Sequence, residues 1–540
     1  MRHEEFREEA LAATSRVALV EAFERALAHD VSFEKVRPEL RRTGKLFGGI
    51  VRDLRRRGPH WVDDWRAGLR VKVLASVLFM FFACLAPAVA FGGLLATLTG
   101  GQIGAVEALL ASAICGVIWS LFAGQPLAIV GATGPNVIFT GILYVACERL
   151  DAPFLPTLAW TGLWAGLFLV TLAALDASSL IRYFTRFSDE IFAALIAMIF
   201  VSEALADMLG PFRDGPSSED GAHLSLLIAL GTFGLAISMS RLRRSSYLLP
   251  KVREFLSDFG PAIALALMSL AAWRLGGASL ETLAVPDHFA PTADRGWLVN
   301  PLDAPTWVIG ASVLPALLLT LLIWMNQNIT ARLIDSPDHK LTKGPAFHWD
   351  IAVMGALVAL MSLFGLPWVV GAVVRSLNHV KSLAVTDGDR VLGTVENRLS
   401  NLVIHVLLGI ACVLLLPLLA YVPMAVLFGM FLFMGVGTLG GNQMVERLRL
   451  WVLDPERYPA VHYLHAVPGK RVHFFTAIQV ACLGGLWAVK ASAIGILFPF
   501  FLALLVPVRM LLARVFAPEH LALLDAEEVP ADEEYREFGV

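Results

Sequence analysis

Charged residues are scarce in this chain. Asp, Glu, Lys and Arg make up only 16% of its 540 residues, whereas soluble domains average about 25%. The deficit excludes an ordinary soluble protein. The net charge of −3 gives no reason to expect a nucleic-acid partner.

Cysteine is also scarce, and its spacing excludes several classes of site. The five cysteines lie in or at the ends of apolar segments, with no CxxC pair, so we expect no zinc site and no disulfide framework. His348 and His405 lack partner ligands at metal spacing, and we interpret them as satisfied hydrogen-bonding residues. We find no metal-binding spacing and no nucleophile with a base, and therefore expect no cofactor and no enzymatic activity. The first seventy residues are polar and show no cleavable signal peptide.

Hydrophobic residues, by contrast, make up 57% of the chain, and its mean hydropathy is +0.67. Apolar runs of membrane length recur from about residue 72 to residue 515, and one crossing takes about 20 residues. The pattern predicts an all-α polytopic membrane protein. Its fourteen predicted spans are 72–96, 103–123, 126–148, 156–176, 188–210, 222–240, 258–275, 307–334, 349–365, 367–384, 402–419, 422–440, 474–489 and 491–515.

The loops between these spans predict the orientation. Lys and Arg gather in the loops after even-numbered spans, whereas the long loop 276–306 carries one Arg beside four acidic residues, which places both termini in the cytoplasm. We expect a short cytoplasmic segment at 1–70, a transmembrane domain at 71–515 and an acidic cytoplasmic tail at 516–540. Ten Lys or Arg between residues 41 and 72 mark the cytoplasmic side and predict contact with anionic membrane lipid.

Two spans are interrupted by Gly and Pro. One interruption runs from Gly124 to Pro135 in span three. The other is Gly365-Leu366-Pro367, where residues 351–374 form either one helix or, as the Gly-Leu-Pro break favours, two helices joined by a turn. Such a pair at matching positions in two halves, 71–276 and 306–515, indicates an inverted-repeat transporter.

Two half-helix N-termini that meet near the middle of a membrane present unpaired N–H groups and partial positive charge. They therefore favour an anion as the bound species. Arg375 lies about two turns beyond Pro367, roughly 12 Å along a helix, and is expected to flank the same cavity. An intramembrane Arg costs at least about 2.5 kcal/mol, which calls for a compensating role. Pairing of Arg375 with a neighbouring carboxylate, or extension of its side chain to the membrane surface, is the alternative.

Long segments of the chain, in order, resemble the bicarbonate transporter family, which contains the red-cell anion exchanger and the sodium-coupled bicarbonate cotransporters. They include FGGIVRDLRRRGPHW (47–61), GQPLAIVGATGP (124–135), NQNITARLIDSPDHKLTKGPAFHWD (326–350), RSLNHVKSL (375–383) and VLFGMFLFMGVGTL (426–439). The resemblance implies fourteen spans in a seven-plus-seven inverted repeat, the fold of nucleobase and sulfate transporters. It further implies core and gate domains that move relative to each other, and a homodimer.

The resemblance also implies a substrate site. That site comprises Pro87, Ala132, Thr133, Gly134, Asn326, Val373, Val374 and Arg375. Asn326 stands where sodium-coupled relatives have Asp and red-cell exchangers have Glu, so its uncharged amide weakens a sodium site and removes proton coupling there. Arg375 matches the chloride/bicarbonate exchangers. Ala372-Val373 replaces a Thr pair of the exchangers, which leaves the anion open.

The function so implied is sodium-independent exchange of chloride for bicarbonate by alternating access in the plasma membrane, or the inner membrane of a bacterial cell, with a role in pH regulation. Sodium-coupled cotransport of bicarbonate or carbonate, borate export and a channel remain alternatives. The short N-terminal segment favours a bacterial member that lacks the large cytoplasmic domain of animal relatives. Lys490 matches an external lysine that reacts with stilbene disulfonates, and an interfacial lysine between the last two spans is an equal alternative. The acidic tail resembles one proposed to bind carbonic anhydrase, although an ordinary solvated tail is favoured.

Overall fold

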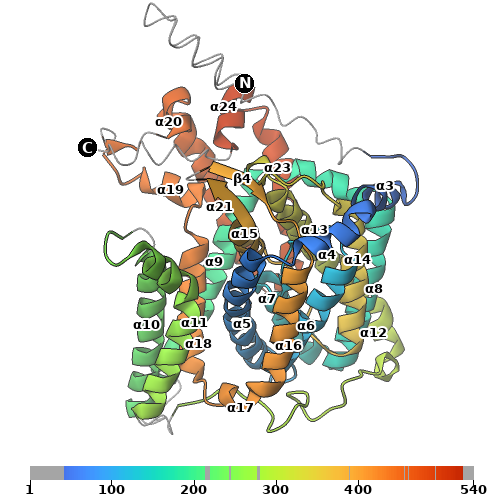
Figure 1. Cartoon of the computed structure of the whole chain (residues 1–540), viewed down its shortest axis with the longest axis vertical. Helices are drawn as coiled ribbons and strands as arrows, with labels where there is room; N and C mark the ends of the chain where they lie inside the picture. Colours follow the sequence, from blue (N-terminus) through green and yellow to red (C-terminus); the bar gives the residue numbers. More distant parts are fainter. Residues whose placement is uncertain are drawn as a thin grey trace, which may run out of the picture.

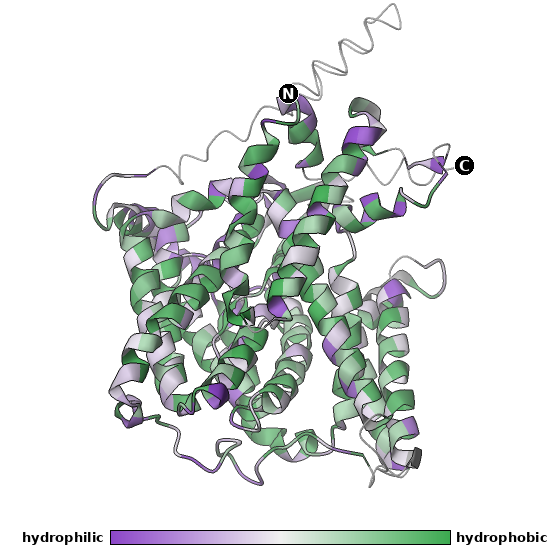
Figure 2. Cartoon of the chain, turned by 180° about the vertical axis from the view of Figure 1, so that it is seen from behind, coloured by the Kyte–Doolittle hydropathy of each residue, from purple (hydrophilic) through white to green (hydrophobic). Residues whose placement is uncertain are grey.

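A computed structural model describes residues 42–526 apart from 213–218, 243–244, 276–279, 388–389, 455–456, 460 and 493. The predicted N-terminal segment before residue 42 and the tail after residue 526 therefore lie outside the described residues. Within them almost all of the regular secondary structure is helical (Figure 1). The apolar residues cover the long helices, and the hydrophilic ones concentrate toward the helix ends, as Figure 2 shows.

The first half of the chain opens with two short helices, α3 and α4, and continues with seven longer ones. Their bounds are α3 Gly48–Arg57, α4 Trp61–Ala67, α5 Val71–Leu98, α6 Ala105–Phe122, α7 Gly134–Arg149, α8 Phe154–Ala174, α9 Arg186–Leu209, α10 Glu219–Arg241 and α11 Pro250–Arg274.

The second half contains more short helices between the long ones. Their bounds are α12 Thr306–Ala311, α13 Val313–Ile334, α14 Phe347–Leu363, α15 Val373–Leu383, α16 Leu399–Leu414, α17 Leu416–Leu419, α18 Met424–Thr438, α19 Gln443–Arg449, α20 His462–Ala466, α21 Gly469–Lys490, α22 Phe498–Ala503, α23 Leu505–Leu512 and α24 Pro518–Leu524.

Each of the fourteen predicted spans overlaps a helix, but the helices are unequal in length. Nine helices in the described part of the chain are long and apolar enough to cross a membrane, or ten if α18 and α19, bent by 79°, form one broken span. The helices α14 and α16 are apolar but shorter. A polytopic helical membrane protein is confirmed, and the count of crossings is not decided by helix length alone.

The long helices pack in two groups. The first contains α5 to α8 and α13 to α16, with α14 against α8 and α16 against both α5 and α6. The second contains α9 to α11, α18 and α21, with α18 against α9 and α10. In Figure 1 the helices α10, α11 and α18 stand on the left, and α6, α8 and α14 stand on the right.

The prediction of an all-α protein is incomplete, because the chain also contains four short strands. Strand β1 (Val130–Gly131) pairs antiparallel with β2 (Val370–Gly371), and β3 (Ala384–Asp387) pairs with β4 (Arg390–Thr394). The chain is extended just before α7 and α15, so these two helices begin later than the spans 126–148 and 367–384 predicted. Pairs of two residues are too short to leave an alternating pattern in the sequence.

The turn before β2 depends on Gly365. Its φ is +60°, a conformation in which side chains are strained. A Cβ there would also lie 2.8 Å from the Nη1 atom of Arg295, whose guanidinium donates to the carbonyls of Phe364 and Gly365. The break at Gly365-Leu366-Pro367 is therefore confirmed, but nine residues, not a tight turn, separate α14 from α15.

A buried ion network joins α3 and α4 to the rest of the first group. Arg57 pairs with Asp64 at 3.1 Å and with Glu396 at 2.9 Å. Asp64 also pairs with Lys343 and with Arg398. Because breaking one partner of a buried pair leaves an uncompensated charge, the network fixes the N-terminal helices to the loops before α14 and α16.

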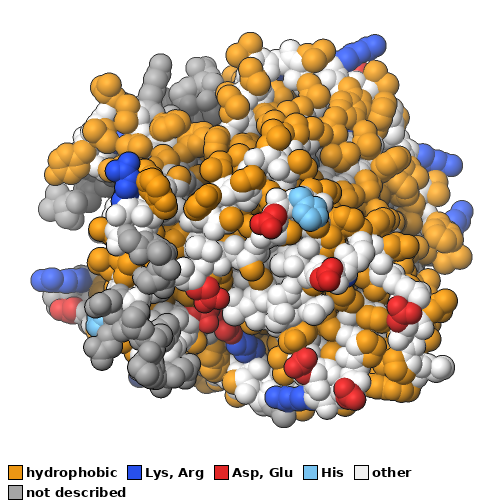
Figure 3. Space-filling model, turned by 90° about the horizontal axis from the view of Figure 1, so that it is seen from below, with side chains coloured by type: hydrophobic (Ala, Val, Ile, Leu, Met, Phe, Trp, Pro, Cys, Tyr) orange, Lys and Arg blue, Asp and Glu red, His pale blue; other side chains and the backbone are white. Residues whose placement is uncertain are grey.

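The face opposite α3 and α24 carries the long loop before α12. Figure 3 shows scattered Asp and Glu side chains among apolar ones on this face. The exposed acidic residues of the loop are Glu281, Asp287, Asp294 and Asp303. At the other face, α24 does not extend into solvent. Its Leu521 and Leu524 are buried, and the Oδ1 atom of Asp525 accepts the Phe187 N–H at the start of α9 (2.7 Å).

Candidate functional site

The pairing of β1 with β2 brings the starts of two helices together. Val130 lies opposite Gly371 and Gly131 opposite Val370, and the Ala372 N–H donates to the Ile129 carbonyl at 2.9 Å. Helix α7 begins three residues after β1, and α15 begins two residues after β2. Neither start has a side-chain cap, so first-turn N–H groups of both helices remain available to a ligand.

The backbone of the extended segment before β1 is held by side chains of α15 and α16. Asn401 donates to the carbonyls of Pro126 and Ala128, each at 2.9 Å. His379 bonds the Leu127 carbonyl at 2.9 Å, and His405 bonds the Val130 carbonyl at 3.1 Å. These bonds replace the helical ones that the segment lacks, which is what buried backbone requires.

Helix α13 holds β2 in a similar way. The Gln327 side-chain oxygen accepts the Gly371 N–H, and the Thr330 hydroxyl donates to the Gly371 carbonyl, both at 2.9 Å. The predicted site residue Asn326 is the neighbour of Gln327. Its amide nitrogen donates to the Leu322 carbonyl of its own helix at 3.1 Å, and its side chain is buried. Gln327 was not predicted, because nothing in the Asn-Gln-Asn run distinguishes it from its neighbours.

Arg375 lies in the first turn of α15, not two turns inside the helix as predicted, because α15 begins at Val373. Its side chain is only 8% exposed, and Nη2 donates to the Ala132 carbonyl at 2.5 Å. A Cβ on Gly131 would lie 2.6 Å from Nη1, so glycine makes room for the guanidinium. The thiol of Cys84 on α5 is a further neighbour. Among the described residues, no carboxylate forms an ion pair with Arg375.

The other predicted site residues differ in accessibility. Ala132 and Gly134 are buried, so Ala132 acts through its carbonyl. Thr133, Pro87 and Val373 are half-buried, and Val374 is 66% exposed. The Thr133 hydroxyl lacks a hydrogen-bond partner among the described residues. The structure thus brings Thr133 and Arg375 to the same pair of helix starts, and it shows no contact between Asn326 and either of them in the described chain.

An aromatic cluster that the sequence analysis missed covers the start of α7. A Cβ on Gly134 would lie 2.3 Å from the Phe200 ring of α9. That ring is 5.8 Å from Phe91 of α5 and stacks on Phe431 of α18 at 6.3 Å. Phenylalanine is common in this chain, with 33 copies, so no sequence signal distinguishes these three. They place both helix groups in contact next to the site.

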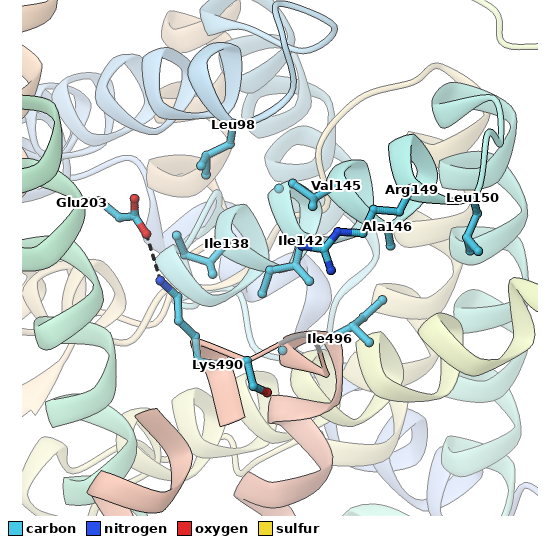
Figure 4. Close-up of a pocket in the computed structure, with 13 residues that line it drawn as sticks. Leu98, Ile138, Ile142, Val145, Ala146, Arg149, Leu150, Glu203, Lys490 and Ile496 are labelled. Atoms are coloured by element: carbon cyan, nitrogen blue, oxygen red, sulfur yellow. Dashed lines mark hydrogen bonds and ion pairs between the residues drawn. The ribbon is translucent and has the colours of Figure 1, made fainter. Parts of the chain in front are cut away.

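A cavity of about 380 Å³ lies along the second half of α7, between the two helix groups. Figure 4 shows Ile138, Ile142 and Arg149 of α7 on one side and Lys490 and Ile496 on the other. Lys490 pairs with Glu203 of α9 at 2.9 Å. The cavity therefore offers one cation, Arg149, that forms no ion pair among the described residues, and one, Lys490, that is neutralised.

The long apolar helices, together with paired helix starts around a buried arginine, are features of a membrane transporter. The family model for the HCO3- transporter integral membrane domain matches residues 45–219 and 213–529. The chain belongs to this family.

Relatives within the family include both exchangers and a cotransporter. Anion exchange protein 2 of Rattus norvegicus is 37% identical over 543 residues, which cover 91% of this chain and 44% of that protein. The band 3 anion transport protein of Homo sapiens is 36% identical over 92% of this chain and 58% of its own length. Sodium bicarbonate cotransporter 3 of Homo sapiens is 35% identical over 90% of this chain and 46% of its own length. The chain spans about half the length of these relatives.

Two solved structures show the same fold. The transmembrane domain of a cyanobacterium bicarbonate transporter, BicA, superimposes with a TM-score of 0.54 at 19% identity, over 77% of this chain and 97% of that one. The murine anion transporter Slc26a9, in its inward-facing state, gives a TM-score of 0.56 at 14% identity, over 91% of this chain and 75% of that one. At these identities the likeness concerns the fold alone.

Proposed function

We propose that this protein exchanges chloride for bicarbonate across the membrane without sodium, by alternating access. The observation that most supports this proposal is the buried guanidinium of Arg375. No described carboxylate forms an ion pair with it, and it lies between two helix starts that have no side-chain cap. Positive charge and unpaired N–H groups together favour a small anion. The relatives named as anion exchangers support this choice.

We infer that the transporter has fourteen membrane segments in two inverted repeats, about 71–276 and 306–515. The grouping of the helices supports the repeat. The first four segments of each half, α5 to α8 and α13 to α16, pack in the first group, and later segments of each half, α9 to α11, α18 and α21, pack in the second. The antiparallel pair of β1 and β2 relates the third segment of one half to the third of the other. The first group then serves as the core domain and the second as the gate domain.

Within this scheme each site residue has a defined role. Thr133 and the first-turn amides of α7 bind the anion from one side, and Arg375 with the first-turn amides of α15 binds it from the other. Asn326 offers an amide without charge, and Pro87, Val373 and Val374 line the apolar walls. Ala132 and Gly134 shape the backbone beneath. The contact of Arg375 with the Ala132 carbonyl keeps the guanidinium between the two helix starts.

Sodium-coupled cotransport of bicarbonate or carbonate is the second candidate, because sodium bicarbonate cotransporter 3 is a relative. A hard cation prefers carboxylate oxygens, and Asn326 supplies only an amide oxygen. Among the described residues, no Asp or Glu forms an ion pair with Arg375. Both observations favour exchange that does not depend on sodium.

For the setting in the cell we propose a multi-pass plasma (or bacterial inner) membrane location with both termini in the cytoplasm, and a homodimer. The Lys/Arg bias of the loops supports this orientation. The acidic loop of Figure 3 then faces outward. The basic residues of α3, among them the exposed Arg55, lie beside exposed Leu54 and Val51, an arrangement that suits the headgroups of anionic lipid.

The substitution Arg375→Gln tests the assignment of the site. We expect anion flux in proteoliposomes to fall roughly 100-fold, since two charge-assisted hydrogen bonds to the anion are lost. The unfolding temperature should stay the same or rise, because a buried unpaired charge is removed. Arg66→Gln is the matched control, since Arg66 is 78% exposed on α4, and it should leave flux unchanged. Wild-type flux in Arg375→Gln would refute the assigned role.

A further inference from the structure

The imidazole of His405 lies between two carbonyl oxygens. Its Nδ1 atom is 2.8 Å from the Asn401 carbonyl, one turn back in α16, and its Nε2 atom is 3.1 Å from the Val130 carbonyl of β1. The side chain is fully buried. A neutral imidazole carries one N–H and can donate to only one of these oxygens. Only the doubly protonated ring donates to both.

The neighbouring His379 shows the contrast. Its Nδ1 atom lies 2.9 Å from the Leu127 carbonyl, and its Nε2 atom lies 2.8 Å from the Ser400 hydroxyl. A hydroxyl can donate as well as accept, so neutral His379 satisfies both contacts. Of the two histidines that hold the segment before α7, His405 is the one with a carbonyl acceptor at each ring nitrogen, so a second proton would complete a bond only there.

The protonation of His405 bears on the site through β1. Val130 lies two residues before Ala132, whose carbonyl accepts Arg375. When His405 loses a proton, one of its two carbonyl partners is left without that bond. The Asn401 carbonyl also receives the backbone N–H of residue 405 within α16, so the loss falls most heavily on Val130 and loosens β1.

The packing around the ring is close. A Cβ on Gly116 of α6 would lie 1.9 Å from the His405 ring, so glycine is needed for the imidazole to reach Val130. The charged and titratable groups on the surrounding elements are few. Burial and the charge of Arg375 oppose a positive charge on His405, and the bonds to the Asn401 and Val130 carbonyls favour it. His379 of α15 is a further titratable neighbour, α6 carries Cys115 beside Gly116, and α5 carries Cys84 against Arg375.

We propose that His405 is a positioning residue whose second proton fixes β1, and that its titration sets the pH dependence of transport. This role rests on the proposed function, because it acts on the same anion site. Transport is fastest while His405 is doubly protonated and slows as pH rises and the bond to Val130 is lost.

The test is chloride self-exchange in proteoliposomes between about pH 5.5 and 8.5, followed with radioactive chloride. Chloride does not titrate in this range, so the pH profile reports the protein. We expect wild-type flux to fall about fivefold with the profile of a single proton, the effect of one hydrogen bond. His405→Gln, which cannot titrate, should vary less than about twofold. The control His288→Gln removes an exposed loop histidine and should keep the wild-type profile.

A second variant reaches the same contact without removing the histidine, in case His405→Gln does not fold. Gly116→Ala displaces the ring from Val130 and should also flatten the profile. A profile that overlays that of the wild type, in either folded variant, would overturn the role of His405 while leaving the proposed function intact. Absence of wild-type chloride exchange at every pH would overturn the proposed function and this role with it.

Discussion

At the scale of single residues, the resemblance and the charge pattern located Arg375 and Thr133 near the paired helix starts. They could not predict Gln327 or Asn401, and for His405 they predicted a hydrogen-bonding role, which is confirmed, but not its partner Val130. These side chains hold backbone carbonyls and N–H groups, and such bonds depend on which segment lies opposite, not on any local motif. The prediction that His348 is a satisfied hydrogen-bonding residue is wrong, because both of its ring nitrogens are buried without a partner in the described structure.

The buried carboxyl of Asp53 predicts how the stability of the folded protein depends on pH. Burial raises the pKa of this carboxyl to about 6, against the opposing effect of Arg56 and of the N–H groups of Trp349 and His348. The folded state therefore binds more protons than the unfolded state between about pH 4 and 6, and this site lowers stability as pH rises through that window. Asp53→Asn removes the effect. Its stability relative to the wild type should rise by on the order of 1–3 kcal/mol from pH 4 to pH 7.

The measurement is thermal unfolding of purified protein in detergent at several pH values. Asp63→Asn serves as the matched control, since Asp63 on α4 is 61% exposed, and its difference from the wild type should not change with pH. A constant difference between Asp53→Asn and the wild type would show that Asp53 is already ionised at pH 4.

At the scale of elements, the two interrupted helices were predicted and their starting residues were not. Pro135 stands in the first turn of α7, as the sequence indicated. For α15 the sequence placed the start at Pro367, whereas the helix begins at Val373 because β2 first pairs with β1. That pairing joins segments 240 residues apart (Val130 to Val370), a distance over which a short apolar run carries no signal.

The contact between α7 and α9 yields a prediction at this scale. Gly134→Ala places a Cβ 2.3 Å from the Phe200 ring, so either the ring or the start of α7 must move. We expect overpacking to lower the free energy of unfolding by roughly 1–3 kcal/mol, which lowers the unfolding temperature. We also expect flux to be at least tenfold lower. In the control Gly234→Ala on α10, a Cβ meets no atom within 4 Å. This control should stabilise slightly through helix propensity, and equal behaviour of the two variants would count against the packing argument.

At the scale of the whole molecule, the sequence predicted a polytopic helical membrane protein because hydropathy reports directly on the membrane, and the resemblance predicted the transporter family. The resemblance implied a core and a gate domain, but the sequence could not predict which helices pack together, since this depends on contacts between distant helices. The cavity between the groups and the cluster of Phe91, Phe200 and Phe431 lie where the groups meet. Relative motion of the groups, as alternating access requires, would open and close this contact.

Sodium-independent exchange is best tested by bicarbonate flux into proteoliposomes, driven by a chloride gradient and followed by internal pH. Sodium is either present or replaced by a large organic cation, and the opposite side holds chloride or an impermeant anion. We predict flux that persists without sodium and stops without a counter-anion, because Arg375 and the helix starts hold one anion at a time and Asn326 gives sodium no carboxylate. Flux that vanishes when sodium is replaced would contradict the account.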